Sequence, residues 1–128
     1  MKELRTSAAP APVGPYAQAV EHSGWIFLSG QIPLDPTTGR LVAGEIEEQA
    51  RRVLDNLRAV LEAAGASLAD VVRTTIYLAD LAVFPRVNAV YAEYFVASPR
   101  PARSTLQVAA LPLGAAIEID AIARLPQR

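Results

Sequence analysis

Three apolar stretches constrain the fold of this chain more than any other feature of its sequence. Residues 71–78, 104–110 and 117–124 have the alternation of β-strands, and each carries apolar side chains on both faces. Only two segments have the repeat of an amphipathic helix, and two helices cover one face of a sheet. The other face then needs a second covering surface, so the sequence predicts an α+β domain that associates with copies of itself.

The two helical repeats lie at residues 46–64 and about 81–96, where apolar residues recur at steps of three and four. Gly65 follows the first repeat as a C-terminal cap, and Pro85 falls in the first turn of the second, where proline is tolerated. Ser98-Pro99 ends the second helix. Two Glu–Arg spacings of i, i+4 predict ion pairs along a solvated face of the first helix. These pairs are Glu47 with Arg51 and Glu48 with Arg52.

The region before the first helix has the composition of an extended arm followed by a β-meander. Residues 6–15 are rich in proline, which favours an extended segment. Residues 17–22 and 25–29 read as strands around a Ser23-Gly24 turn, and residues 35–39 have the composition of a further reversal. With a third strand before the first helix, the predicted order is β, β, β, α, β, α, β, β.

Length and composition exclude several classes of function. At 128 residues, 52% of them hydrophobic, the chain is expected to form one domain over residues 1–128. A net charge of -1 without a basic run argues against nucleic acid as a partner. With no cysteine and one histidine, His22, the usual metal-ligand sets are absent, and we expect no metal. No apolar span reaches about 18 residues and no signal peptide is evident, so we expect a soluble cytoplasmic protein with no membrane partner.

Arg103 is the most informative single residue. It stands at the start of an otherwise apolar stretch that runs to Leu125. A guanidinium in such a place needs an anion, and its planar fork matches a carboxylate with two parallel hydrogen bonds. The anion is either a neighbouring acid in a structural ion pair or the carboxylate of a ligand, and this segment alone leaves both open.

Several motifs in order along the chain resemble the RidA family, also called YjgF. They are Gly14-Pro15-Tyr16-Ala17-Gln18-Ala19, Leu28-Ser29-Gly30-Gln31-Ile32-Pro33, Val87-Asn88-Ala89-Val90-Tyr91, Pro101-Ala102-Arg103-Ser104-Thr105 and Ile117-Glu118-Ile119. Each is weak alone, and their ordered spacing over almost the whole chain carries the resemblance. The resemblance implies a chorismate-mutase-like (bacillus-type) α+β fold with a mixed sheet and two helices on one face. It also implies a barrel-like homotrimer with sites at the subunit interfaces.

The resemblance also implies an activity. Active members of the family hydrolyse short-lived enamines and imines, such as 2-aminoacrylate, 2-iminopropanoate and 2-iminobutanoate, which pyridoxal-phosphate enzymes release. The products are a 2-keto acid and ammonia. Such imines already hydrolyse in water, so positioning and one proton acceptor suffice and no cofactor is implied.

Three residues take catalytic roles by this resemblance. Arg103 binds the substrate carboxylate, and Glu118 orients or deprotonates the attacking water. Tyr16 hydrogen-bonds the substrate nitrogen or the water from the proline-bounded arm, reaching a neighbouring subunit's pocket. Both acidic and aromatic residues also have a structural interpretation. In it, Glu118 forms an ion pair with Arg103 or Arg73, and Tyr16 is an aromatic anchor that holds the arm in place.

Four further residues fall at the family's substrate-binding positions. Ser29 and Gly30 end a strand where backbone N–H groups can approach a ligand, although the residues by themselves favour an ordinary strand-ending turn. Asn88 either touches the ligand or ties its helix to a loop, and we favour the structural role. Thr105 departs from the pattern, because many relatives carry cysteine there, but a threonine can form the same pocket wall.

Other functional classes stay open from the sequence. A non-catalytic binder of 2-keto acids or other small carboxylates would use Arg103 and tolerate loss of Glu118. Members of the family have also been called ribonucleases, translation inhibitors or chaperone-like proteins. The acidic balance and the absence of a basic stripe argue against RNA binding.

Overall fold

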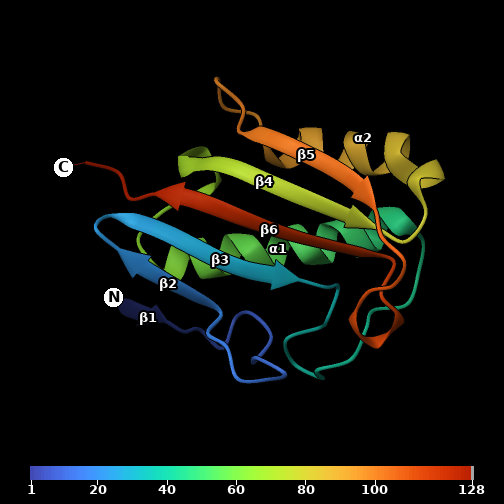
Figure 1. Ribbon diagram of the computed structural model, residues 1–128, viewed down its shortest axis with the longest axis horizontal. Coiled ribbons are helices and arrows are strands. Elements are labelled where there is room, and N and C mark those ends of the chain that lie inside the picture. Colours follow the sequence, from blue (N-terminus) through green and yellow to red (C-terminus); the bar gives the residue numbers. More distant parts are fainter. Residues whose placement is uncertain (128) are drawn as a thin grey trace.

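One sheet forms the centre of the structure, a computed structural model that describes residues 1–127. Its strand order is β1-β2-β3-β6-β4-β5, and all neighbours are antiparallel except the parallel pair β4 and β5. The strands are β1 (Lys2–Leu4), β2 (Ala19–His22), β3 (Trp25–Gln31), β4 (Val71–Leu78), β5 (Ala102–Gln107) and β6 (Ile117–Arg124). The sheet is therefore mixed, as the sequence resemblance implies (Figure 1).

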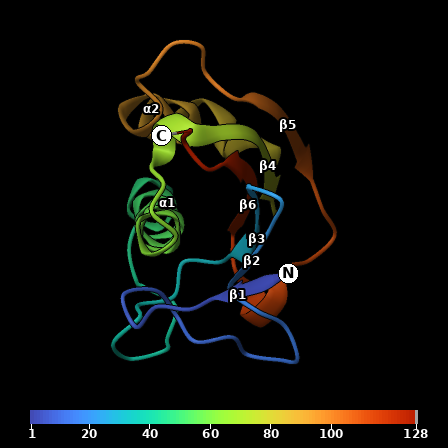
Figure 2. The same ribbon diagram turned by 90° about the vertical axis from the view of Figure 1, so that its left-hand side faces the viewer.

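Two α-helices cover the same face of this sheet (Figure 2). They are α1 (Ile46–Ala63) and α2 (Phe84–Tyr94), and short 3-10 helices lie at Leu68–Asp70, Leu81–Val83 and Pro112–Gly114. The apolar stripe of α1, which includes Val53 and Leu57, packs with Ile119 of β6 in one buried cluster. The predicted α+β class, with helices on one face, is confirmed.

Several element boundaries differ from the sequence prediction, and three of these differences are informative. The third strand before the first helix is β1 rather than a continuation after the 35–39 reversal, where only a bridge between Leu34 and Leu41 forms. Strand β5 ends at Gln107 instead of residue 110, because its only neighbour, β4, ends at Leu78. The second helix begins with a separate 3-10 turn and ends at Tyr94. A three-residue strand carries no periodic signal, and ladder length depends on a distant partner.

The predicted i, i+4 ion pairs on α1 are wrong. Glu47 binds Arg86 at 2.7 Å, and Arg51 binds Glu93 at 3.1 Å, so both side chains reach across to α2. Arg52 donates instead to the amide oxygen of Asn56 at 3.1 Å. The helices lie side by side, and the tertiary partners replace the local ones that spacing alone suggests.

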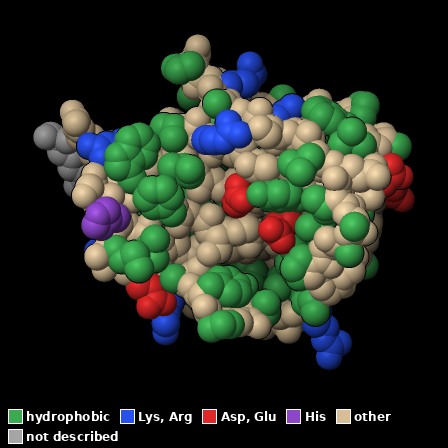
Figure 3. All heavy atoms as spheres, viewed as in Figure 1, with side chains coloured by type: hydrophobic (Ala, Val, Ile, Leu, Met, Phe, Trp, Pro, Cys, Tyr) green, Lys and Arg blue, Asp and Glu red, His purple; other side chains and the backbone are tan. Residues whose placement is uncertain are grey.

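The other face of the sheet has no helix over it. It leaves large apolar side chains exposed, among them Phe27 at 45% and Val72 at 41%, with Trp25 and Leu106 exposed to a similar degree. Figure 3 views this face and shows hydrophobic side chains gathered on it, with acidic side chains near its centre beside a hollow. A single chain therefore leaves uncovered the surface for which the sequence predicts a second copy.

The end of α1 provides a test of local backbone conformation. Gly65 has a φ of 82°, and the N–H groups of Gly65 and Ala66 donate to the carbonyls of Glu62 and Leu61 in a Schellman motif. We expect Gly65→Ala to lower the free energy of unfolding by about 1–2 kcal/mol, because a Cβ disfavours the left-handed region. Urea unfolding of the wild type and the variant measures the difference in their free energies of unfolding. Gly14→Ala, where an added Cβ meets only Tyr16 at 3.5 Å, is the control, and equal stabilities of the two variants would contradict the assignment.

Candidate functional site

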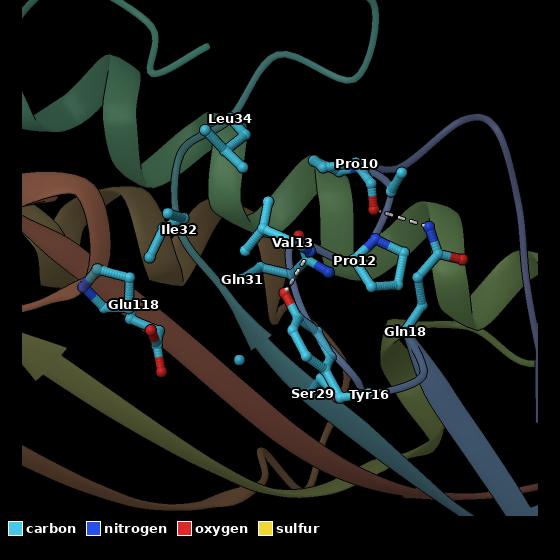
Figure 4. Close-up of a pocket in the computed structure, with 13 residues that line it drawn as sticks. Pro10, Pro12, Val13, Tyr16, Gln18, Ser29, Gln31, Ile32, Leu34 and Glu118 are labelled. Carbon is cyan, nitrogen blue, oxygen red and sulfur yellow. Dashed lines mark hydrogen bonds between the residues drawn. The ribbon is translucent and has the colours of Figure 1, made fainter. Parts of the chain in front are cut away.

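A cleft of about 350 Å³ opens where the N-terminal arm, residues 5–17, crosses the ends of β3 and β6. Its walls come from the arm, from the residues that follow β3 and from Pro112 (Figure 4). The lining residues are Pro10, Ala11, Pro12, Val13, Tyr16, Gln18, Ser29, Gly30, Gln31, Ile32, Leu34, Pro112 and Glu118. Four of the residues predicted from the sequence, Tyr16, Ser29, Gly30 and Glu118, thus meet at one cleft.

Tyr16 lies on the arm and is folded back onto it. Its hydroxyl accepts a hydrogen bond from the backbone N–H of Val13 at 3.2 Å, as the dashed line in Figure 4 marks. This bond lies within the arm, and Tyr16 is 47% exposed, so anchoring of the arm by Tyr16 stays a prediction. Because the hydroxyl is an acceptor in this bond, its own hydrogen stays available to donate to a group in the cleft.

Ser29 and Gly30 form the floor of the cleft at the end of β3. The Ser29 hydroxyl donates to the Ala17 carbonyl at 2.6 Å, which directs this side chain to the arm rather than to the cleft. A Cβ added to Gly30 would lie 2.8 Å from Cδ of Glu118 and closer still to a carboxylate oxygen. Gly30 thus leaves room for the Glu118 carboxylate, which a side chain at this position would displace, a packing reason that the sequence patterns do not show.

Glu118 has a carboxylate without a cationic partner. Among residues 1–127 it makes no ion pair, and Arg73, one of its predicted structural partners, donates to the Ser104 hydroxyl at 2.8 Å instead. Burial raises the pKa of Glu118, and the nearby charge of Asp120 raises it further. Asp120 is itself held by the Tyr77 hydroxyl, which donates to it at 3.0 Å. A half-buried, unpaired carboxylate of this kind is suited to accept a proton.

Arg103 lies on the opposite side of the sheet. It pairs in register with Thr74, whose hydroxyl bonds the Tyr91 hydroxyl at 2.7 Å, so Arg103 is on the helix-covered face at the edge strand β5. Its guanidinium lies 4.8 Å from the ring centroid of Tyr91 and 5.3 Å from that of Phe84. Within residues 1–127 it has no carboxylate partner, so the predicted structural ion pair does not form.

Two other predicted residues accompany Arg103 rather than Glu118. Asn88 is on α2, four residues after Phe84 and three before Tyr91, and so shares a helix face with both rings. Thr105 follows Arg103 by two residues on the same face of β5, and its hydroxyl is buried without a hydrogen-bond partner among the described residues. The predicted site residues therefore lie in two groups. The cleft half consists of Tyr16, Ser29, Gly30 and Glu118, and the arginine half consists of Arg103, Asn88 and Thr105.

The two aromatic rings on which the Arg103 guanidinium stacks are not evident from the sequence motifs. Phe84 belongs to none of the motifs, and Tyr91 is only the last residue of the motif at 87–91. The signal available in the sequence is that these two aromatic residues, seven positions apart, share one face of the predicted second helix. Stacking of this kind orients a guanidinium while leaving its N–H donors available to an anion.

The arrangement of side chains and helices bears on metal binding and on insertion into a membrane. In the part of the chain that the structure describes, no three His, Asp or Glu side chains are grouped to hold a metal ion. Neither helix in that part is both long and apolar enough to cross a membrane.

The chain is similar to known proteins over nearly its whole length. The sequence profile of the family described as Endoribonuclease L-PSP matches residues 6–125. A RutC family protein of Pyrococcus horikoshii is 52% identical over 96% of this chain and 98% of the relative. The 2-iminobutanoate/2-iminopropanoate deaminase of Mus musculus is 49% identical over 95% of this chain and 90% of the relative.

A solved structure agrees with these relatives. The crystal structure of a Thermotoga maritima protein, described as a candidate endoribonuclease, superposes with a TM-score of 0.95 at 50% identity, over 99% of each chain. The chain therefore belongs to the RidA/YjgF family. The family resemblance and the α+β fold that it implies are confirmed.

The raised pKa of Glu118 gives a direct test of the electrostatics of the cleft. Asp120→Asn removes a negative charge near Glu118 and keeps an oxygen that can accept from Tyr77. The ionised form of Glu118 is then less disfavoured, so we expect the pKa of Glu118 to fall. A ¹³C NMR titration of the side-chain carboxyl measures it, with Asp80→Asn as the control on an exposed loop. An unchanged or higher pKa would contradict this account.

Proposed function

We propose that this protein is an enamine/imine deaminase, a hydrolase that converts 2-iminobutanoate and 2-iminopropanoate, the tautomer of 2-aminoacrylate, to 2-keto acids and ammonia. The observation that carries the proposal is that neither Arg103 nor Glu118 has an oppositely charged partner among residues 1–127 of one chain. One is suited to bind a carboxylate and the other to take a proton. The name of the mouse relative supports the same chemistry.

We further propose that the complete site forms between copies of the chain, as a homotrimer. The cleft half opens beside the sheet face that has no helix, and that face carries exposed apolar side chains such as Phe27. The arginine half lies at the edge strand β5, on the other side of the sheet. Docking the edge of one copy against the open face of the next would bring Arg103 to the neighbour's Glu118 and cover the apolar surface.

The reaction then needs few groups. The enamine tautomerises to the imine, and Arg103 binds its carboxylate with two N–H donors. A water attacks C2 of the imine while Glu118 accepts the proton of that water, which gives a carbinolamine. Glu118 delivers that proton to the nitrogen. It then takes the hydroxyl proton of the carbinolamine as the carbonyl forms and passes it to the nitrogen, so the C–N bond breaks and ammonia leaves. In this proposal the Tyr16 hydroxyl, whose own hydrogen is not used in its bond to the Val13 N–H, donates to the nitrogen or the water.

The ribonuclease name given to some members of the family has less support in this chain. The net charge is -1, and the acidic side chains Glu118 and Asp120 stand at the cleft and on the face beside it. Both would repel a phosphate backbone, whose binding depends on Lys and Arg. The cleft instead suits a small anion that brings its own carboxylate to an arginine.

An imine-trapping assay tests the activity. Threonine dehydratase supplies 2-iminobutanoate, semicarbazide traps what is not hydrolysed, and the trapped product is measured by absorbance. We expect the wild-type protein to reduce trapping and Arg103→Ala to lose this effect by at least about a hundredfold, because the carboxylate clamp is gone. Arg40→Ala, on an exposed turn, is the control and should behave as wild type. A folded Arg103→Ala protein of undiminished activity would refute the assignment.

Mixing two inactive variants tests whether the site is shared between copies. Glu118→Gln should lower kcat by about a hundredfold to ten-thousandfold, since the proton acceptor is lost. Arg103→Ala and Glu118→Gln chains, unfolded together and refolded at equal amounts, should recover about a quarter of wild-type activity if each site takes one residue from each of two copies.

The control for that experiment is either variant refolded alone. Absence of recovery in mixed oligomers, verified by mass spectrometry, would contradict a shared site. If the wild type hydrolyses no imine, and the wild type and Glu118→Gln bind a 2-keto acid equally well, a non-catalytic binder of 2-keto acids is favoured instead.

A further inference from the structure

Gln18 holds the N-terminal arm through a buried amide that the proposed chemistry does not use. Its side chain is only 3% exposed. The amide oxygen accepts from the N–H of Thr6 at 2.8 Å, and the amide nitrogen donates to the carbonyls of Thr6 at 3.0 Å, Pro10 at 2.9 Å and Ala9 at 3.3 Å. Figure 4 shows the bond from Gln18 to the Pro10 carbonyl. One side chain thus replaces the backbone ladder that residues 5–17 lack.

This set of contacts requires a carboxamide. The position needs one acceptor for an N–H group and donors for carbonyls, and only an amide offers both on one planar group. Its two N–H groups serve three carbonyls, so one of them is shared between two acceptors. A glutamate would place a second oxygen against carbonyl oxygens. A methionine of similar length would leave the backbone groups of Thr6 and Pro10 without partners in a buried place, which is unfavourable.

Gln18 also connects the arm to the floor of the cleft. Its backbone carbonyl accepts from the N–H of Ser29 at 3.0 Å, next to Gly30 and Glu118. Its side chain holds residues 6–10, which lead directly into the cleft wall at Pro10–Val13. Gln18 therefore links the wall and the floor through both its side chain and its backbone, beside the bond from the Ser29 hydroxyl to the Ala17 carbonyl.

We propose that Gln18 is a positioning residue that closes the arm over the cleft and so sets the affinity for the substrate, an inference that rests on the proposed deaminase function. Release of the arm removes the apolar wall contributed by Pro10 and Val13. Glu118 on β6 and Arg103 on β5 remain in place, because neither strand depends on the arm for its ladder. Loss of the Gln18 amide then weakens binding more than it slows the chemical step.

Two readouts on Gln18→Met test this. Trypsin cleaves after Arg5, and both backbone groups of the next residue, Thr6, are bound by Gln18, so cleavage at this bond should be at least about tenfold faster in the variant. The KM for 2-iminobutanoate should rise about tenfold with kcat changed less than about threefold, since uniform binding is lost. Gln18→Glu is a second variant that serves if Gln18→Met does not fold.

Gln49→Met is the matched control, because its exposed amide donates to the Gly44 carbonyl at 3.1 Å, far from the arm along the chain. It should change neither readout. Cleavage after Arg5 at the wild-type rate would overturn the locking role, whatever the activity. Faster cleavage with an unchanged KM, or a fall in kcat alone, would overturn the role in affinity. If wild type hydrolyses no imine, the proposed function fails, while the cleavage rate still decides whether Gln18 locks the arm.

Discussion

The alternation of side chains along β6 is the constraint on which both the core and the cleft depend. Ile117, Ile119, Ala121 and Ala123 are buried beneath the helices, and the residues between them face the other side. A slip of one residue in the pairing of β6 with β3 and β4 would expose the core residues and bury Glu118 and Asp120 under α1. The register that buries the core residues of β6 therefore also places the Glu118 side chain at the cleft.

The ion pairs between the two helices involve neither of the two proposed functional charges. Arg86 binds Glu45 and Glu47, and Arg51 binds Glu93, all at the surface between the two helices. Arg103 instead rests on aromatic rings, and Glu118 is partly removed from water beside a like charge. Groups held in such environments are more common at functional sites than in plain structural networks. Their position on opposite sides of one sheet is the physical reason for proposing a site shared between two copies.

Much of the fold could be predicted from the sequence because its main elements have strong local signals. The stripe of α1, the cap at Gly65 and the β-branched run of β4 all lie where their patterns indicate. The signals fail where the outcome depends on a distant partner. Strand β5 stops where β4 stops, and Glu47 pairs with Arg86 on α2 instead of with Arg51. The competing long-range contact prevails over local spacing in each case.

The sequence by itself determined the residue types of the candidate site, the α+β class and the membership of the family, because motifs and periodicity are properties of the chain order. Only the tertiary structure decided which of those residues meet. It joined Tyr16, Gly30 and Glu118 at one cleft, set Arg103 apart on aromatic rings, and gave Gln18 its contacts with the arm. These arrangements depend on side-chain packing and hydrogen bonds between segments far apart in the chain, and no local pattern encodes their geometry.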